Sequence, residues 1–204
     1  MAIVTDNAIL YHIPKTGGTW VKRAMRAAGL DWGYTHTAVG PSPFGLKRSH
    51  GTPDNTPDGA KMGRFAIAFV RRPVAWYRSY WAFRSRKGAR RDEGFPADGL
   101  WSDDFDTFVN NLLDAYPDGF VSTLYRLYVG AHAQKVDYVG RTEHLGDDLA
   151  RGLALAGESY DDSALRLHPV VNASPDEWKA RAVLSAETQA RVAECEKWVR
   201  EMFY

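Results

Sequence analysis

The sequence predicts an α/β fold built around a mainly parallel sheet. Two short apolar runs, residues 8–13 and 65–70, have the length and composition of buried strands. Each run leads directly into a segment whose apolar residues recur at helical spacing. Strands that alternate with helices along a chain are typical of α/β folds with parallel strands.

The first half of the chain contains both of these strand–helix pairs. A helix is expected over residues 20–28 after the first strand, and Gly29 supplies its stop. Residues 40–63 are rich in Pro, Gly, Asn and Asp, which is typical of a loop. Two further expected elements are a short strand at residues 34–39 and, after the strand 65–70, a helix at residues 73–83 that opens with Pro73.

The second half is predicted to be mostly helical. Ser102 is the expected cap of a helix with its apolar face at residues 105–113. The remaining expected elements are helices at 120–133, 143–156 and 185–203, a strand at 136–139 and loops at 84–99 and 157–177. We expect one domain spanning residues 1–204, because this length is ordinary for a single domain.

Composition limits the cellular setting. The formal net charge is +1, so overall charge names no partner, and Cys195 is the single cysteine, which excludes an intramolecular disulfide. The first strand begins close to Met1, leaving no room for a signal peptide, and no apolar run approaches the ~20 residues that span a bilayer. We therefore expect a cytoplasmic protein without a membrane partner.

The segment between the first strand and the first helix has the character of an anion site. A glycine-containing turn that leads into a helix directs backbone N–H groups, and the positive end of the helix dipole, toward one point. Lys15 adds a full positive charge and two threonines add hydroxyl donors. The residues expected to bind the anion are Lys15, Thr16, Gly17, Gly18, Thr19 and Trp20.

The order of residues in this segment separates it from the ATP/GTP loop. That loop reads G-x-x-x-x-G-K-[ST], with its lysine after the glycines, whereas Lys15 precedes Gly17 and Gly18. Pro-Lys-Thr-Gly-Gly-Thr resembles the loop that holds the 5′-phosphosulfate in sulfotransferases that use 3′-phosphoadenosine 5′-phosphosulfate (PAPS). The resemblance implies a three-layer, P-loop NTPase-like sulfotransferase fold with helices flanking the central sheet, PAPS as donor and the 3′,5′-bisphosphate PAP as product.

A second motif lies at the next strand end. Arg71 follows the strand 65–70, at the edge where ligands of open α/β sheets bind, and Ser79 follows about two helical turns later. An arginine and a hydroxyl placed in this way can hold one phosphate. The pattern R-x-P-x-x-x-x-x-S resembles the 3′-phosphate site of the same family, which implies that Arg71 and Ser79 contact the 3′-phosphate.

Two catalytic residues are expected. Sulfuryl transfer resembles phosphoryl transfer in its need for positioning and charge stabilisation, and Lys15 can stabilise charge on the bridging oxygen of the leaving nucleotide. His50 is the expected general base, since histidine titrates in the useful range and Lys47-Arg-Ser-His50 resembles the K-T-H stretch that holds the base in cytosolic sulfotransferases. That match sets Arg48 at the lysine position. His36 is the second choice as base, and Glu93 is a poor match to the glutamate of carbohydrate-type relatives.

Other residues have weaker assignments. The segment 138–149 resembles a family segment beside the adenosine, in which Arg141 and Thr142 line that side; a helix cap at Thr142 is the alternative. The segment 168–174 resembles the loop before the final helix in carbohydrate-type members. His12 is interpreted as a satisfied residue of the first strand.

A basic run extends from Arg71 to Arg91, with eight Lys or Arg and no Asp or Glu. An acidic acceptor, nucleic acid and a solvated loop are three interpretations of it, of which nucleic acid is the least favoured partner and the solvated loop the most favoured interpretation.

The motifs together predict a PAPS-dependent sulfotransferase that moves a sulfuryl group to a hydroxyl or amine of an acceptor. The acceptor is expected to be a small molecule or a carbohydrate, and acidic compounds are among the candidates. No metal is expected, because the sequence has no Cys/His cluster with ligand spacing and no carboxylate cluster. Two other interpretations are an atypical P-loop small-molecule kinase and a non-catalytic protein that binds nucleotides or polyanions.

Overall fold

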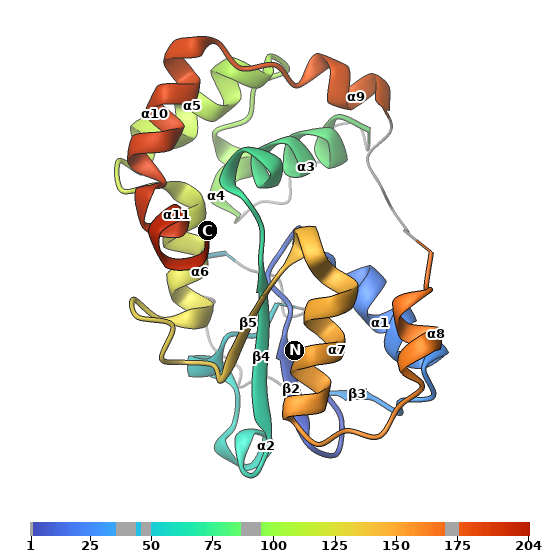
Figure 1. Ribbon diagram of the computed structural model, residues 1–204. Coiled ribbons are helices and arrows are strands. Elements are labelled where there is room, and N and C mark those ends of the chain that lie inside the picture. The colour runs from blue at the N-terminus through green and yellow to red at the C-terminus, as the bar shows by residue number, and fades with distance from the viewer. Residues whose placement is uncertain (1, 36–43, 46–49, 87–94, 170–175) are drawn as a thin grey trace. The chain divides into compact units, whose positions relative to one another are not determined.

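The computed structural model describes residues 2–35, 44–45, 50–86, 95–169 and 176–204 (Figure 1). Contacts divide the chain into two compact units. The sheet unit holds the described residues 2–35, 50–71 and 126–169, and the helical unit holds residues 44–45, 72–86, 95–125 and 176–204. The single domain expected over residues 1–204 stays a prediction.

The sheet unit is built on an open, mixed sheet of five strands in the order β3-β1-β2-β4-β5. Their bounds are β1 Ile3–Val4, β2 Ala8–Tyr11, β3 Gly33–Tyr34, β4 Phe65–Val70 and β5 Tyr138–Arg141. The α/β class is confirmed. The prediction of a mainly parallel sheet is wrong, because β2, β4 and β5 pair in parallel while β1 is antiparallel to both β2 and β3.

A tight turn explains the antiparallel pair. Only three residues join β1 to β2, and the N–H of Thr5 donates to the carbonyl of Ala8 at 3.0 Å. A connection this short returns the chain on itself, whereas a parallel pair needs a crossover of a dozen or more residues. β1 has only two residues, too few to show a strand pattern in the sequence.

Helices α1 (Gly18–Ala27), α7 (Leu145–Leu155) and α8 (Asp162–Arg166) share one apolar core with the sheet (Figure 1). Ala8, Leu10, Ile67 and Phe69 lie on the sheet face that they cover. The unit also contains α2 (Asp58–Lys61), a 3₁₀ turn at Pro53–Asn55 and another at Thr142–His144. The three-layer arrangement stays a prediction.

The helical unit contains α3 (Pro73–Arg86), α4 (Pro96–Gly99), α5 (Phe105–Ala115), α9 (Asp176–Arg181), α10 (Ala186–Cys195), α11 (Lys197–Phe203) and the first half of α6 (Phe120–Val129). The cap of α5 is Asp104 rather than Ser102, since the Asp104 carboxylate accepts from the N–H of Thr107 at 2.8 Å. The predicted loop 157–177 contains α8 and the start of α9.

The helix expected over residues 185–203 is broken at Glu196, whose side chain is buried. Its carboxylate accepts hydrogen bonds from the N–H groups of Val121 and Ser122, at 2.9 and 2.8 Å, and from the hydroxyls of Ser122 and Tyr77. Glu196 therefore caps the N-terminus of α6 from a distant part of the chain. Burial raises the pKa of this carboxyl, against the hydrogen bonds that favour its charge.

Part of the basic run is also structural. Arg84 is buried and forms an ion pair with buried Asp98 at 2.9 Å, and Asp98 accepts a hydrogen bond from Tyr80 as well. Arg84 thus has an internal partner, so it is not part of a solvated loop. Residues 87–91 of the run lie outside the described residues. Within the described residues, no helix combines the length and apolar character needed to cross a membrane.

Candidate functional site

The carboxyl ends of three neighbouring parallel strands, β2, β4 and β5, lie at one edge of the sheet. Arg71 follows β4, and its Nη1 donates to the carbonyl of Lys15 in the loop after β2, at 3.4 Å. Thr142 follows β5, and its hydroxyl donates to the carbonyl of Val70 at 2.8 Å. Ligands of open α/β sheets bind at this edge. The fold therefore brings together two of the residues that the sequence predicted, Lys15 and Arg71.

The loop between β2 and α1 has an unusual backbone. Lys15 and Gly17 have φ angles of 66° and 88°, in the left-handed region. For a residue with a Cβ this region costs about 1–2 kcal/mol, so the loop holds Lys15 in a strained conformation. Buried Thr16 steadies the turn, because its hydroxyl donates to the carbonyl of Ile13 at 2.9 Å. The Thr16 hydroxyl therefore donates its hydrogen bond within the loop and not to an anion.

The N-terminus of α1 is open to an anion. Gly17 is the N-cap residue, and among the described residues no side chain accepts from the first turn and no acidic residue lies in it. The first N–H groups of an α-helix have no carbonyl partner within the helix, and they carry the positive end of its dipole. An anion from outside the chain would satisfy both.

Both glycines of the loop are also required by close packing. A Cβ on Gly18 would lie 2.1 Å from Cδ2 of His12, and a Cβ on Gly17 would lie 2.5 Å from Cδ2 of Leu145. Contacts of this kind under 3.0 Å do not occur without displacement of an atom. The helix therefore begins directly against an imidazole ring and the first residue of α7. Sequence reasoning missed both neighbours.

His50 is attached to the end of β2. Its Nδ1 lies 2.9 Å from the carbonyl oxygen of His12. Because a carbonyl only accepts, Nδ1 carries the proton and Nε2 is the basic nitrogen. The backbone carbonyl of His50 accepts from the hydroxyl of buried Tyr128 at 3.2 Å. These bonds orient the ring in the tautomer that a general base requires.

His12 lies beneath the loop. Its ring is tilted against that of His50, with 4.7 Å between the centroids. Burial lowers the pKa of His12 to about 3, and the neighbouring charges of His50, Lys22 and Lys15 act in the same direction. His12 is therefore neutral at pH 7, and it supports both Gly18 and His50. The sequence interpretation of His12 as a strand residue did not include this role.

The other loop residues differ in exposure. Thr19 is exposed on the first turn of α1. Trp20 is buried in the core, and its indole N–H lies 3.1 Å from the carbonyl of Pro169 and 3.4 Å from that of His168. The part of Trp20 that faces an anion at the helix start is thus its backbone N–H.

Four other residues named from the sequence have predicted roles that no contact among the described residues tests. Ser79 lies half-buried in α3 of the helical unit, and its shared grip on a phosphate with Arg71 stays a prediction. His36, Arg48 and Glu93 lie outside the described residues.

In the segment after β5, Thr142 does not have the position of a cap. Arg141 precedes the 3₁₀ turn as its N-cap residue, so Thr142 lies inside the turn. The backbone N–H of Arg141 donates to the carboxylate of Asp148 at 2.6 Å, and its Nε lies 4.0 Å from the same oxygen. Asp148 thus fixes the end of β5. Contact of Arg141 and Thr142 with adenosine stays a prediction.

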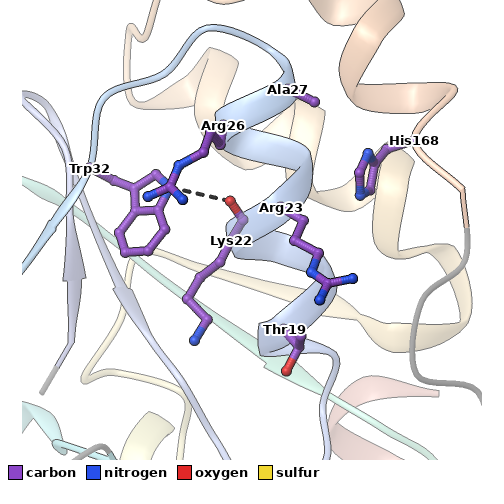
Figure 2. A pocket seen from close by; sticks show the side chains of 7 residues that line it. All are labelled: Thr19, Lys22, Arg23, Arg26, Ala27, Trp32 and His168. Carbon is purple, nitrogen blue, oxygen red and sulfur yellow. Dashed lines mark hydrogen bonds between the residues drawn. The ribbon is translucent and has the colours of Figure 1, made fainter.

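A cavity of about 510 Å³ lies along the outer face of α1 (Figure 2). Five of its lining residues come from one face of the helix and two aromatic residues complete it: Thr19, Lys22, Arg23, Arg26, Ala27, Trp32 and His168. Sequence reasoning missed this cavity. The available signal was the spacing of Thr19, Lys22, Arg23 and Arg26, at i, i+3, i+4 and i+7 of the predicted helix.

Among the described residues, no group of three His, Cys, Asp or Glu side chains is placed to hold a metal ion. Comparisons of the chain with protein-family models, curated proteins and solved structures found no match. The indications of function in this chain are therefore its own residues and the resemblance of its two motifs.

Proposed function

We propose that the chain is a PAPS-dependent sulfotransferase with a P-loop-like sulfotransferase fold. One observation carries the proposal. The uncapped N-terminus of α1, the strained Lys15 and the guanidinium of Arg71 lie together at the carboxyl ends of β2 and β4. Each of these features attracts an oxyanion, and the two motifs that contribute them resemble the two ends of the PAPS site.

The loop residues have distinct roles in this proposal. Backbone N–H groups of Gly18, Thr19 and Trp20 hold the 5′-phosphosulfate at the helix start. Lys15 stabilises the charge that grows on the oxygen bridging phosphorus and sulfur. Arg71 holds the 3′-phosphate, and the resemblance of the sequence motif assigns Ser79 to the same group. The donor fits these residues because they supply positive groups for two separate anionic ends of one nucleotide.

Transfer follows an in-line displacement. The acceptor oxygen or nitrogen forms a bond to sulfur while the bond from sulfur to the bridging oxygen breaks, and that electron pair stays on the 5′-phosphate of PAP. Nε2 of His50 takes the acceptor proton. The hydrogen bond from Nδ1 to the carbonyl of His12 supports this role, since it leaves Nε2 as the basic nitrogen.

The first test is a pair of binding and turnover measurements. Calorimetry with PAP and with ATP should show preferential binding of PAP, and labelled sulfate should pass from PAPS to a panel of hydroxyl, amine and acidic carbohydrate acceptors. Magnesium-dependent consumption of ATP would favour the kinase interpretation instead. Binding of polyanions alone, with steep salt dependence, would favour a non-catalytic binder.

The base is tested separately. His50→Ala should lower turnover by roughly 10²–10⁴-fold while leaving the affinity for PAP within a few-fold of the original. His132→Ala, which removes an exposed histidine from a turn, is the matched control. Unchanged turnover in His50→Ala would remove His50 from the role of base.

A further inference from the structure

The cavity on the outer face of α1 is strongly cationic. Lys22, Arg23 and Arg26 all line it, together with the hydroxyl-bearing Thr19 (Figure 2). Its volume of about 510 Å³ lies within the range of roughly 300–1,000 Å³ that is typical of small-molecule sites. Neither the strand-end motifs nor the proposed transfer reaction uses these three cations.

No acidic side chain balances this charge. Among the residues that the structure describes, no Asp or Glu forms an ion pair with Lys22, Arg23 or Arg26. Some exposed arginines elsewhere do have such partners, since Arg166 pairs with two aspartates and Arg191 pairs with one. In the cavity, by contrast, three neighbouring cations share one face of α1 with no acidic partner among the described residues.

The spacing of these charges along α1 is unfavourable for the helix itself. Lys22 and Arg26 are four residues apart and Arg23 and Arg26 are three apart, spacings at which like charges repel. The helix dipole favours a cation only at Arg26, which lies in the last turn of α1. An anionic ligand would relieve the repulsion among the three cations.

Two aromatic side chains hold two of these cations, Lys22 and Arg26, in place. The Lys22 ammonium donates to the hydroxyl of Tyr34 at 3.2 Å, and the Arg26 guanidinium lies over the ring of Trp32, 4.9 Å from its centroid. The Trp32 indole donates to the backbone carbonyl of Lys22 at 3.2 Å, which fixes the ring against the helix (Figure 2). The charges are therefore positioned without being neutralised.

Another lining residue, His168, gives an independent indication. Nε2 of His168 is buried and has no hydrogen-bond partner among the described residues. Buried polar atoms in folded proteins are nearly always paired, and an unpaired one calls for a ligand or a water. His168 lies on the other side of Arg23 from Trp32, so it closes one end of the cavity (Figure 2).

We propose that this cavity binds a small ligand that carries at least two oxyanion groups, such as phosphates, sulfates or carboxylates. Arg23 and Arg26 offer guanidinium forks that match oxyanion geometry, and Lys22 supplies a further charge. The site adjoins the proposed donor site at Thr19, which belongs to both, but its three cations take no part in the proposed transfer. The two proposals are therefore tested by different variants. The cavity favours a compact ligand over a nucleic acid, because a duplex does not enter a space of this volume.

The test is calorimetry with three probes of different oxyanion chemistry: pyrophosphate, citrate and 1,3-benzenedisulfonate. Resorcinol, which keeps the ring of the last probe without its charges, is the neutral control. At least one probe should bind, and Arg23→Gln and Arg26→Gln should each weaken it about tenfold or more, since each removes a charge-assisted hydrogen bond. Arg151→Gln, which removes an exposed arginine of α7 outside the cavity, should leave binding unchanged.

A second variant separates this cavity from the donor site. Lys15→Ala should leave the affinity for the probe that binds the cavity within twofold of the affinity of the original protein. The proposal is overturned if Lys15→Ala abolishes binding while Arg23→Gln does not, because the probe then occupies the helix start. Absence of binding for all three probes also overturns it, as does tighter, Arg23-dependent binding of duplex DNA, which would make the face a nucleic-acid surface.

Discussion

Helices α1 and α6 begin in nearly the same way and differ in what lies at their N-termini. Each follows a glycine in the left-handed region, Gly17 with φ 88° and Gly119 with φ 85°. The carbonyl of each glycine accepts the first helical hydrogen bond, from Val21 and from Thr123, both at 3.0 Å. At α6 the buried carboxylate of Glu196 fills the N-terminus, whereas no described side chain does so at α1.

This difference separates a helix start that the chain itself satisfies from one that we propose binds a ligand. The chain supplies its own anion to α6 and surrounds it with hydrogen-bond donors, so that helix start is satisfied without a ligand. At α1 the chain supplies only cations, Lys15 and Arg71, and a strained backbone. Strain and unmet donors of this kind cluster at functional sites, because a ligand offsets them.

The largest expected effect is the loss of the internal anion. Glu196→Ala should lower the free energy of unfolding by roughly 3–5 kcal/mol, because four buried donors from Tyr77, Val121 and Ser122 lose their acceptor. Urea denaturation would measure this. Glu194→Ala, two residues earlier and exposed, is the matched control and should have little effect. A small loss in Glu196→Ala would remove the contrast between the two helices.

The next effect concerns the imidazole beneath the α1 loop. Burial holds the pKa of His12 at about 3, below its ordinary value of 6.5. As the pH falls, the unfolded chain therefore binds this proton first. Stability that His12 contributes above pH 6.5 should be lost progressively between pH 6.5 and 3, by up to about 3 kcal/mol at pH 4.

The control for this pH dependence is His12→Asn, which has no titrating group at the position. Denaturation midpoints of the two proteins should diverge as the pH is lowered from 7 to 4, with the original protein losing more stability. Parallel curves would show that His12 is protonated as easily in the folded protein as in the unfolded chain.

A smaller effect is expected at the glycine that starts α1. Gly17→Ala should cost about 2 kcal/mol, since alanine is strained at this φ and its Cβ would displace Leu145. Gly29→Ala is a matched control, because Gly29 has φ 78° but open space around it, and it should cost about 1 kcal/mol. PAP affinity should fall in Gly17→Ala alone. Equal losses of stability in both variants would contradict the packing of Leu145 on Gly17.

Much of the fold was predictable because its signals are local. The strands β2 and β4 and the helices α1 and α5 follow directly from runs and spacings of apolar residues. Pairing direction is not such a signal, which is why β1 and its antiparallel pairing with β2 and β3 were missed. Glu196 resembles any polar helix residue in the sequence, and only its contacts with α6 show why the last helix breaks there.

The candidate site was predictable to a similar extent. Motifs at strand ends identified Lys15 and Arg71, and parallel neighbouring strands bring such ends together. His12 was missed because it falls inside an apolar run, where nothing local shows that its ring lies on Gly18. The cationic cavity was missed because its charge is notable only when the absence of acidic partners among the described residues is known.

The smallest expected change in stability tests the strain directly. Lys15→Gly should raise the free energy of unfolding by up to about 1 kcal/mol, because glycine adopts φ 66° without the cost that lysine bears, partly offset by glycine's greater freedom in the unfolded chain. The same variant should weaken PAP binding about tenfold or more, since it removes a charge from the loop.

Ala133→Gly provides the comparison, because Ala133 has φ 55° in a turn away from this loop. It should give a similar gain in stability with unchanged PAP affinity. If Lys15→Gly gains stability and keeps its PAP affinity, the strained lysine has no part in anion binding, and the two helix starts then differ only in their caps. If only Lys15→Gly loses affinity, the strain at α1 is retained for the ligand that this helix start attracts.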